Sequence, residues 1–180
     1  VAVVRGESVA EGVRISKACA KGGIPAIEVT YTVPGATEVI KALKEQDVNN
    51  EMIIGAGTVL DAATARIAIL AGAEFIVSPA FDKETAKLCN LYQIPYMPGC
   101  MTITEMTTAM QYGADIIKLF PGSAFGPSFV KAVKAPYHCL ISRCFLAELP
   151  HFVVAFLNHG LEWNKIVRPS FEHCNVYLRL

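Results

Sequence analysis

The sequence has no net charge, no long hydrophobic run and no closely paired cysteines, and each absence excludes a class of protein. Sixteen Lys and Arg balance sixteen Asp and Glu, so no overall positive field attracts nucleic acid or an acidic membrane face. The longest apolar stretches fall well short of the roughly 20 residues that a membrane-spanning helix needs. We therefore expect neither nucleic acid nor a membrane as a partner, and a pocket as the place for any ligand.

The six cysteines form no C-x-x-C pair (Cys19, Cys89, Cys100, Cys139, Cys144 and Cys174). A chain of this size does not need disulfides, so we expect free thiols. The opening run Val1–Val4 is followed at once by Arg5, Gly6 and Glu7, too short for the apolar core of a secretory signal. The expected location is the cytoplasm.

What the sequence does have is a regular alternation of short β-branched runs and stretches of helical period. With 53% hydrophobic and 18% charged residues among 180, intrinsic disorder is excluded. Strands are predicted to begin near Val1, Ala26, Met52, Phe75, Pro95 and Ile116, in steps of about 20 to 26 residues that each leave room for one helix. This rhythm predicts βα units and a parallel sheet with helices outside it.

The predicted helices have start and stop signals. Ser8–Glu11 is typical of a capping box, Pro34 is expected in a first turn, and Thr102 and Thr104 precede another helix. Glycines at 22–23, 72 and 113 stand where a helix is expected to end before the next strand.

Two architectures share this rhythm, the open doubly wound sheet and the closed barrel. No strand-linked G-x-G-x-x-G is present, and Gly55-Ala-Gly57 alone is a weak signal. Polar residues occur toward the carboxyl ends of many different strands, which a barrel gathers around one axis. We therefore predict an α/β fold of the (β/α)8 TIM-barrel type with six clear βα units.

The tail breaks this pattern. Residues 1–136 form the predicted units, whereas residues 137–180 contain all four histidines, one glycine and no aspartate, and the seventh and eighth strands cannot be assigned. We treat 1–180 as one barrel domain whose last two units are atypical or incomplete. Its His and Cys residues match none of the usual zinc spacings, so no metal is expected. A coding-frame change, a divergent extension or a sequence error is the preferred explanation.

Lys118 is the first candidate for chemistry, because all its immediate neighbours in Ile116–Phe120 are apolar. Strand alternation puts Ile116, Lys118 and Phe120 on one face. If that face is the barrel interior, desolvation lowers the pKa of the amine, and a neutral amine can form a Schiff base with a ketone. The alternative is a strand-end lysine that reaches water.

Glu28 is the second candidate, a charged residue inside the predicted strand Ala26–Tyr31. Facing inward, it would share the interior with Lys118 and act as general acid and base; otherwise it is a structural ion pair or faces outward. Arg5 ends the first strand, where its guanidinium suits a carboxylate, or it is a surface cation. Thr58 ends the third strand as a ligand contact, or it caps the helix near Asp61.

Six strings then show a resemblance: Val-Ala-Val-Val-Arg5, Ile-Glu28-Val-Thr-Tyr-Thr-Val-Pro34, Ile-Gly-Ala-Gly-Thr58-Val, Phe-Ile-Val-Ser-Pro79, Tyr-Met-Pro-Gly99 and Ile-Lys118-Leu-Phe-Pro121. In this order and spacing, over residues 1 to about 136, they resemble the 2-keto-3-deoxy-6-phosphogluconate (KDPG) and 4-hydroxy-2-oxoglutarate (KHG) aldolase family.

The resemblance implies a class I aldolase on a (β/α) barrel, a homotrimer without metal or other cofactor, and a small 2-keto acid as substrate. Lys118 would be the Schiff-base lysine, and Glu28 the acid and base that works through a bound water. KDPG would yield pyruvate and glyceraldehyde 3-phosphate, and KHG would yield pyruvate and glyoxylate. Thr58 and Pro79 match pocket positions, and Phe120 packs beside the lysine.

The sequence departs from the family at two places. Many members carry an arginine four residues after the glutamate for the pyruvate carboxylate, but this position is Thr32, and Arg5 is the candidate replacement. The glycine-rich phosphate-binding segments have no counterpart after Pro136. Because these segments are missing, one alternative is an inactive barrel that serves as a binding or assembly subunit. A separate alternative is a phosphate-binding isomerase or epimerase in which Lys118 is a base.

Overall fold

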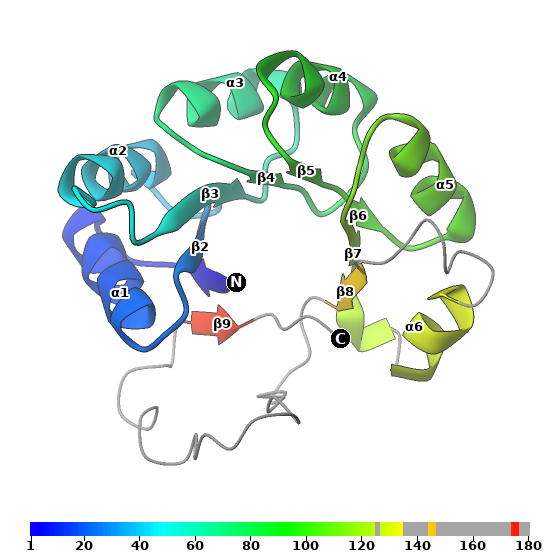
Figure 1. The fold of residues 1–180 in the computed structure, drawn as a ribbon, viewed down its shortest axis with the longest axis horizontal. Coiled ribbons are helices and arrows are strands. Elements are labelled where there is room, and N and C mark those ends of the chain that lie inside the picture. The colour runs from blue at the N-terminus through cyan, green and yellow to red at the C-terminus, as the bar shows by residue number, and fades with distance from the viewer. Residues whose placement is uncertain (125–126, 135–143, 147–173, 177–180) are drawn as a thin grey trace.

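The computed structural model describes residues 1–124, 127–134, 144–146 and 174–176. Strands line the inner side of an arc, and the helices cover its outer side (Figure 1). The strands are β1 Ala2–Val4, β2 Ala26–Thr30, β3 Ile53–Gly57, β4 Ile76–Val77, β5 Tyr96–Met97, β6 Gly99–Cys100, β7 Ile117–Leu119, β8 Cys144–Leu146 and β9 Cys174–Val176. The helices are α1 Val9–Lys21, α2 Ala36–Gln46, α3 Ala62–Leu70, α4 Lys83–Tyr92, α5 Ile103–Gln111 and α6 Pro127–Lys134, with a short 3-10 turn at Gly122–Ala124.

All six predicted strands are present and every pair between β1 and β8 is parallel, which confirms the βα rhythm. The fifth predicted strand is divided at Pro98. Its first half, β5, pairs with β4, and its second half, β6, pairs with β7, so one stretch of chain belongs to both hydrogen-bonded sheets. The strand wall therefore continues from β1 to β8 through this stretch.

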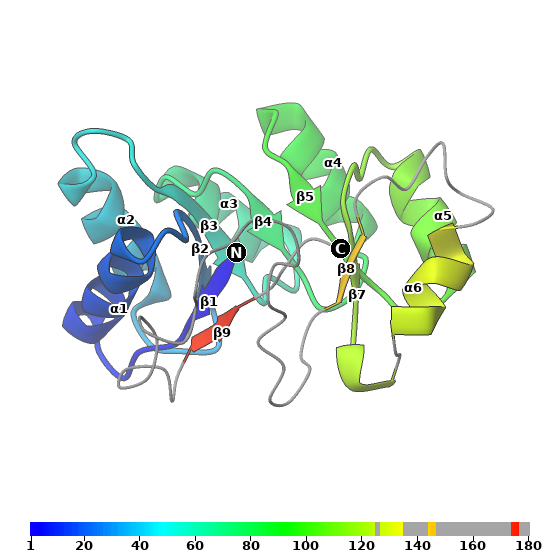
Figure 2. The ribbon, with the colours of Figure 1, turned by 60° about the horizontal axis from the view of Figure 1, so that its bottom comes forward.

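The tail supplies strands at both edges of the wall. β8 lies parallel to β7, as a seventh barrel strand would, whereas β9 pairs antiparallel with β1, through Val3 and Asn175. Figure 2 shows β8 beside β7 and β9 beside β1 from a second direction. An antiparallel β9 departs from an all-parallel barrel, and the rest of the predicted tail lies outside the described residues.

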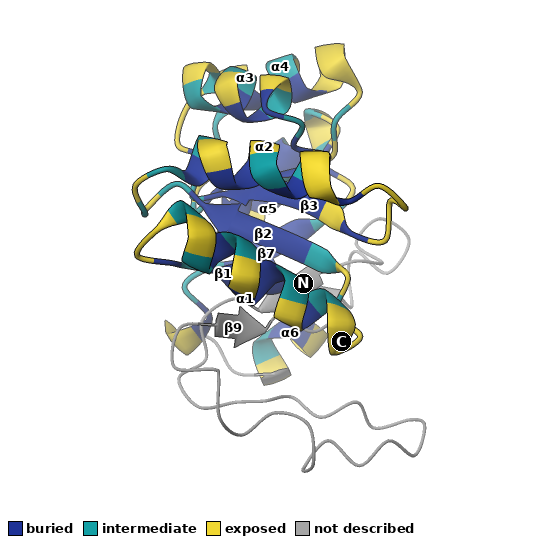
Figure 3. Ribbon diagram, turned by 90° about the vertical axis from the view of Figure 1, so that its left-hand side faces the viewer, coloured by how far each residue is buried: buried dark blue, intermediate teal, exposed yellow. Residues whose placement is uncertain are grey.

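The two faces of the strands separate by period 2. Ile27, Val29 and Ile54 are fully or almost fully buried in the core formed with the helices. Their neighbours Val3 and Glu28 are equally buried, but they face the other side of the wall, since adjacent strand residues alternate. Figure 3 shows buried strands behind helices whose outward faces are exposed. The strands are thus buried on both faces, as a parallel sheet requires.

The helix signals are confirmed at most positions. Thr102 and Glu105 form a complete capping box at the start of α5. At the start of α1, Oγ of Ser8 accepts from the N–H of Glu11, but the Glu11 carboxylate accepts from the N–H of Glu7, so this box is incomplete. Gly72 and Gly113 have φ of 104° and 91°, which only glycine adopts easily.

Two start predictions were wrong by small shifts. Pro34 precedes the cap residue Gly35, so it lies outside the first turn of α2. Thr104 lies inside α5, because the cap is Thr102.

Candidate active site

Lys118 is the central residue of β7 and points to the inner side of the wall. Its flanking residues Ile117 and Leu119 pack outward with α5 and α6, so alternation turns Lys118 inward. Only 5% of its surface is exposed, and its Nζ lies 5.1 Å from the centroid of the Phe120 ring. The reading of Lys118 as a solvent-directed lysine is therefore wrong.

Glu28, the central residue of β2, is 2% exposed and faces the same interior. Burial raises the pKa of its carboxyl above the ordinary value, and the nearby positive charges of Lys118 and Arg5 oppose part of that rise. The amine of Lys118 and the guanidinium of Arg5 are therefore close enough to the Glu28 carboxyl to interact with its charge. The outward-facing alternative for Glu28 is wrong.

Glycines of β3 make room for this arrangement. A Cβ added at Gly57 would overlap the carboxylate of Glu28, and one added at Gly55 would overlap the ring of Phe75. The Glu28 side chain therefore lies directly across the backbone of β3. Sequence reasoning missed Gly57 as a site residue. The available signal was the alternation Gly55-Ala-Gly57, which leaves two successive positions on one face of the strand without side chains.

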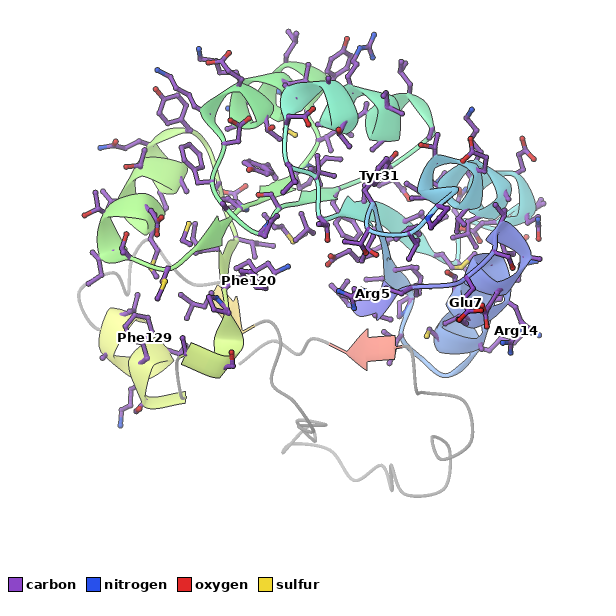
Figure 4. All side chains as sticks on the ribbon, turned by 180° about the vertical axis from the view of Figure 1, so that it is seen from behind. Arg5, Glu7, Arg14, Tyr31, Phe120 and Phe129 are labelled. Atoms are coloured by element: carbon purple, nitrogen blue, oxygen red, sulfur yellow. The ribbon has the colours of Figure 1, made fainter. Side chains whose placement is uncertain are left out.

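Arg5 and Phe120 follow β1 and β7 and lie on the inner side of the arc of strands (Figure 4). Both are half-buried. The positive charge of Arg5 lowers the pKa of the Glu28 carboxyl, and the ring of Phe120 lies against Nζ of Lys118. The structure thus brings four of the seven predicted site residues together.

The other three predicted site residues also follow carboxyl ends of strands. Thr58 directly follows β3, is half-buried and has φ of 55°, an uncommon conformation for a β-branched residue. The helix cap at this place is Asp61, so the reading of Thr58 as the cap is wrong. Thr32 is exposed, and its hydroxyl lies 2.8 Å from that of Thr30.

Pro79 follows β4 and lies against the strand next to Lys118. A Cβ added at Gly99 would overlap the carbonyl group of Pro79, and Gly99 is the register partner of Lys118. Pro79 thus reaches the site through a backbone contact that only glycine permits. Gly99 was a motif residue in the sequence, but its role was not predicted.

A cavity of about 280 Å³ lies at the opposite edge of the wall. Its lining includes Cys89, Gln93, Pro95, Gly113 and Asp115, at the amino ends of β5 and β7. The candidate site is at the carboxyl ends of the strands, where barrels of this kind carry their chemistry, so this cavity is separate from it.

The described part of the chain contains no cluster of three or more His, Cys, Asp or Glu side chains placed to hold a metal ion. Within the same residues, no helix has the length and apolar character needed to cross a bilayer. Cys19, Cys89 and Cys100 are buried thiols. The side chains of Cys139, Cys144 and Cys174 lie outside the described part.

Parallel strands, outer helices and polar side chains at the carboxyl ends of the strands define a TIM-type α/β fold. The chain belongs to the KDPG and KHG aldolase family, whose sequence model matches residues 1–142. It is 34% identical to a 2-dehydro-3-deoxy-phosphogluconate aldolase of Treponema pallidum over 76% of this chain and 65% of that protein. The chain thus spans slightly less than two thirds of this relative's length.

Solved structures agree in fold. The 2-keto-3-deoxy-6-phosphogluconate aldolase of Zymomonas mobilis ZM4, solved with 3-phosphoglycerate, is 29% identical with a TM-score of 0.75, over 82% of this chain and 69% of that one. The KDPG aldolase of Legionella pneumophila, with pyruvate captured as a covalent carbinolamine intermediate, is 26% identical with a TM-score of 0.71, over 81% and 68%.

Proposed function

We propose that the protein is a class I aldolase that cleaves a small 2-keto acid and releases pyruvate. The observation that carries the proposal is the burial of Lys118 and Glu28 on the inner face of one strand wall, within electrostatic reach of each other. Ionisable groups enclosed together in this way are typical of working sites. The captured carbinolamine in the Legionella relative supports the same chemistry.

In the proposed reaction Nζ of Lys118 attacks the C2 ketone, and loss of water from the carbinolamine leaves a protonated imine. Removal of the proton from the C4 hydroxyl breaks the C3–C4 bond, and the electron pair moves into the imine. An aldehyde leaves and an enamine remains. Protonation at C3 and hydrolysis then release pyruvate and restore the amine.

Glu28 is the proposed proton carrier. A carboxyl whose pKa is raised by burial holds and releases a proton closer to neutral pH, which suits general acid and base catalysis. Through a bound water it protonates the carbinolamine oxygen and takes the proton from the C4 hydroxyl. The ring of Phe120 beside Nζ favours the positive charge of the imine.

Arg5 is proposed to bind the substrate carboxylate, because a guanidinium donates to both oxygens at once and Thr32 offers no charge. Thr58 and Pro79 would line the pocket from the adjacent strand ends, with Thr32 at its exposed rim. Both KDPG and KHG are proposed substrates. The homotrimer implied by the resemblance and the cytoplasmic location expected from the sequence stay predictions.

The test is pyruvate release by the full chain from each of the two acids, followed through a pyruvate-dependent dehydrogenase. Lys118→Met abolishes release, and Glu28→Gln lowers kcat by about 10²–10⁴, the usual contribution of a positioned acid and base. Lys87→Met is the control, since Lys87 is half exposed and paired with Glu84 on α4. Equal rates for Lys118→Met and the parent, or no pyruvate from either acid, would contradict the proposal.

A further inference from the structure

Beneath the loop that joins β4 to α4, two buried hydroxyl groups form a compact hydrogen-bonded network. The hydroxyl of Tyr96 lies 2.7 Å from Oγ of Ser78. Oγ of Ser78 donates to the carbonyl of Ala80 at 2.6 Å, and the N–H of Asp82 donates to the Tyr96 hydroxyl at 3.1 Å. Two of these bonds join the loop residues 78–82 to Tyr96 on the adjacent strand β5, and the third lies within the loop.

Each of the two hydroxyl groups has one proton to donate. The Tyr96 oxygen accepts from the Asp82 N–H. Because the Ser78 hydroxyl donates to the carbonyl of Ala80 at the short distance of 2.6 Å, we assign Tyr96 as the donor to Oγ of Ser78. The Tyr96 hydroxyl also lies 3.3 Å from that carbonyl. Because Ser78 and Tyr96 are 1% and 6% exposed, water cannot readily replace a missing partner, and a buried unsatisfied group is costly.

The network fixes the loop at a place that borders the site. Gly99 donates its N–H to the carbonyl of Ser78 at 2.9 Å, and the carbonyl group of Pro79 lies directly against the α-carbon of Gly99. Gly99 is in register with Lys118 on the neighbouring strand. A shift of residues 78–82 would thus move Pro79 relative to Lys118.

We propose that Tyr96 is a positioning residue of the aldolase site, whose hydroxyl, with that of Ser78, fixes the β4–α4 loop and so fixes Pro79 beside Lys118. Tyr96 itself packs on the outer side of the wall with the helices, so it acts through the loop. The inference rests on the proposed function, because it assigns Pro79 to the substrate pocket.

The test compares Tyr96→Phe with Tyr31→Phe in the full chain. Tyr31 is the matched control, since its partly buried hydroxyl also lies 3.0 Å from a second hydroxyl, that of Thr37. Active chains are counted by trapping pyruvate with borohydride. Tyr96→Phe raises KM for the keto acid by about two- to tenfold, the equivalent of one hydrogen bond. The kcat, calculated per trapped site, stays within about twofold because Lys118 and Glu28 keep their places. Tyr31→Phe leaves both constants unchanged.

A purely structural role gives another result: Tyr96→Phe then lowers the number of trapped sites and leaves KM unchanged, which overturns the proposal. Ser78→Ala gives the same KM increase by removing the second hydroxyl, and it serves as the test if Tyr96→Phe does not fold.

Hydrogen exchange separates failure of this inference from failure of the proposed function. Tyr96→Phe speeds exchange of the amides of Asp82 and Gly99, whereas Tyr31→Phe does not, whether or not the chain cleaves a keto acid. Unchanged exchange at both amides overturns the positioning role. A parent chain that traps no pyruvate refutes the aldolase assignment, and with it the catalytic meaning of the loop.

Discussion

Gly57→Ala tests whether the position of the Glu28 carboxyl matters, because the added methyl group would occupy the place of that carboxylate. Gly57 lies in β3 with an extended backbone that alanine adopts easily, so the effect comes from the contact alone. Non-bonded carbon atoms stay about 3.5–4.0 Å apart, and the carboxylate must therefore move by about 1 Å or more.

A misplacement of this size costs about 10²-fold in rate at a catalytic group. We expect Gly57→Ala to lower kcat for pyruvate release by that factor. Forcing a methyl group into a filled interior also costs about 1–3 kcal/mol of unfolding free energy. Gly22→Ala is the control for both quantities, because a Cβ at Gly22 meets only carbonyl oxygens at 3.3 and 3.4 Å on the exposed end of α1.

The assay compares kcat for pyruvate release in Gly57→Ala, in Glu28→Asp, whose side chain is one methylene shorter, and in the double variant. Because the overlap extends along the Glu28 side chain from Cγ to the carboxylate, both changes act on the same contact, and we expect their losses of kcat to be non-additive. Additive losses of log kcat, or a Gly57→Ala variant as active as Gly22→Ala, would refute the placement of Glu28 against β3.

Three further predictions concern stability, each measured by urea unfolding. Burial raises the pKa of Glu28 above its ordinary value of 4.5, so this group stabilises the fold below pH 4.5 and its contribution is lost as pH rises through the raised pKa. The unfolding free energy of Glu28→Gln relative to the parent therefore rises with pH across that window. A pH-independent difference would contradict the raised pKa. Thr102→Ala removes the cap of α5 and costs about 1 kcal/mol; an unchanged midpoint argues against the capping box. Leu43→Ala, at a fully buried position, costs about 2–5 kcal/mol, and a cost below 1 kcal/mol would show that α2 is not packed as described.

The parts of the fold that follow local rules were predictable from the sequence. Period 2 in Ile116–Phe120 placed Lys118 on the face opposite Ile117 and Leu119, and burial on both faces enclosed it. Glycine at 72 and 113 marked helix ends, because their positive φ is a local requirement.

The parts that depend on contacts between distant residues were not predictable. The division of the fifth strand at Pro98 arises because its halves pair with different neighbours. The antiparallel β9 depends on its pairing with β1, about 170 residues earlier, and no start signal precedes it. The hydroxyl of Tyr96 contacts Ser78, which is 18 residues earlier in the sequence, and no strand or helix periodicity predicts such a contact.

Trapping with pyruvate and borohydride, followed by peptide mapping, tests most directly whether an enclosed amine and a carboxyl act together on a keto acid. We predict one reduced pyruvate adduct per chain, on Nζ of Lys118, formed more slowly in Glu28→Gln. Absence of an adduct, an adduct spread over other lysines, or equal trapping rates in parent and Glu28→Gln would contradict the account.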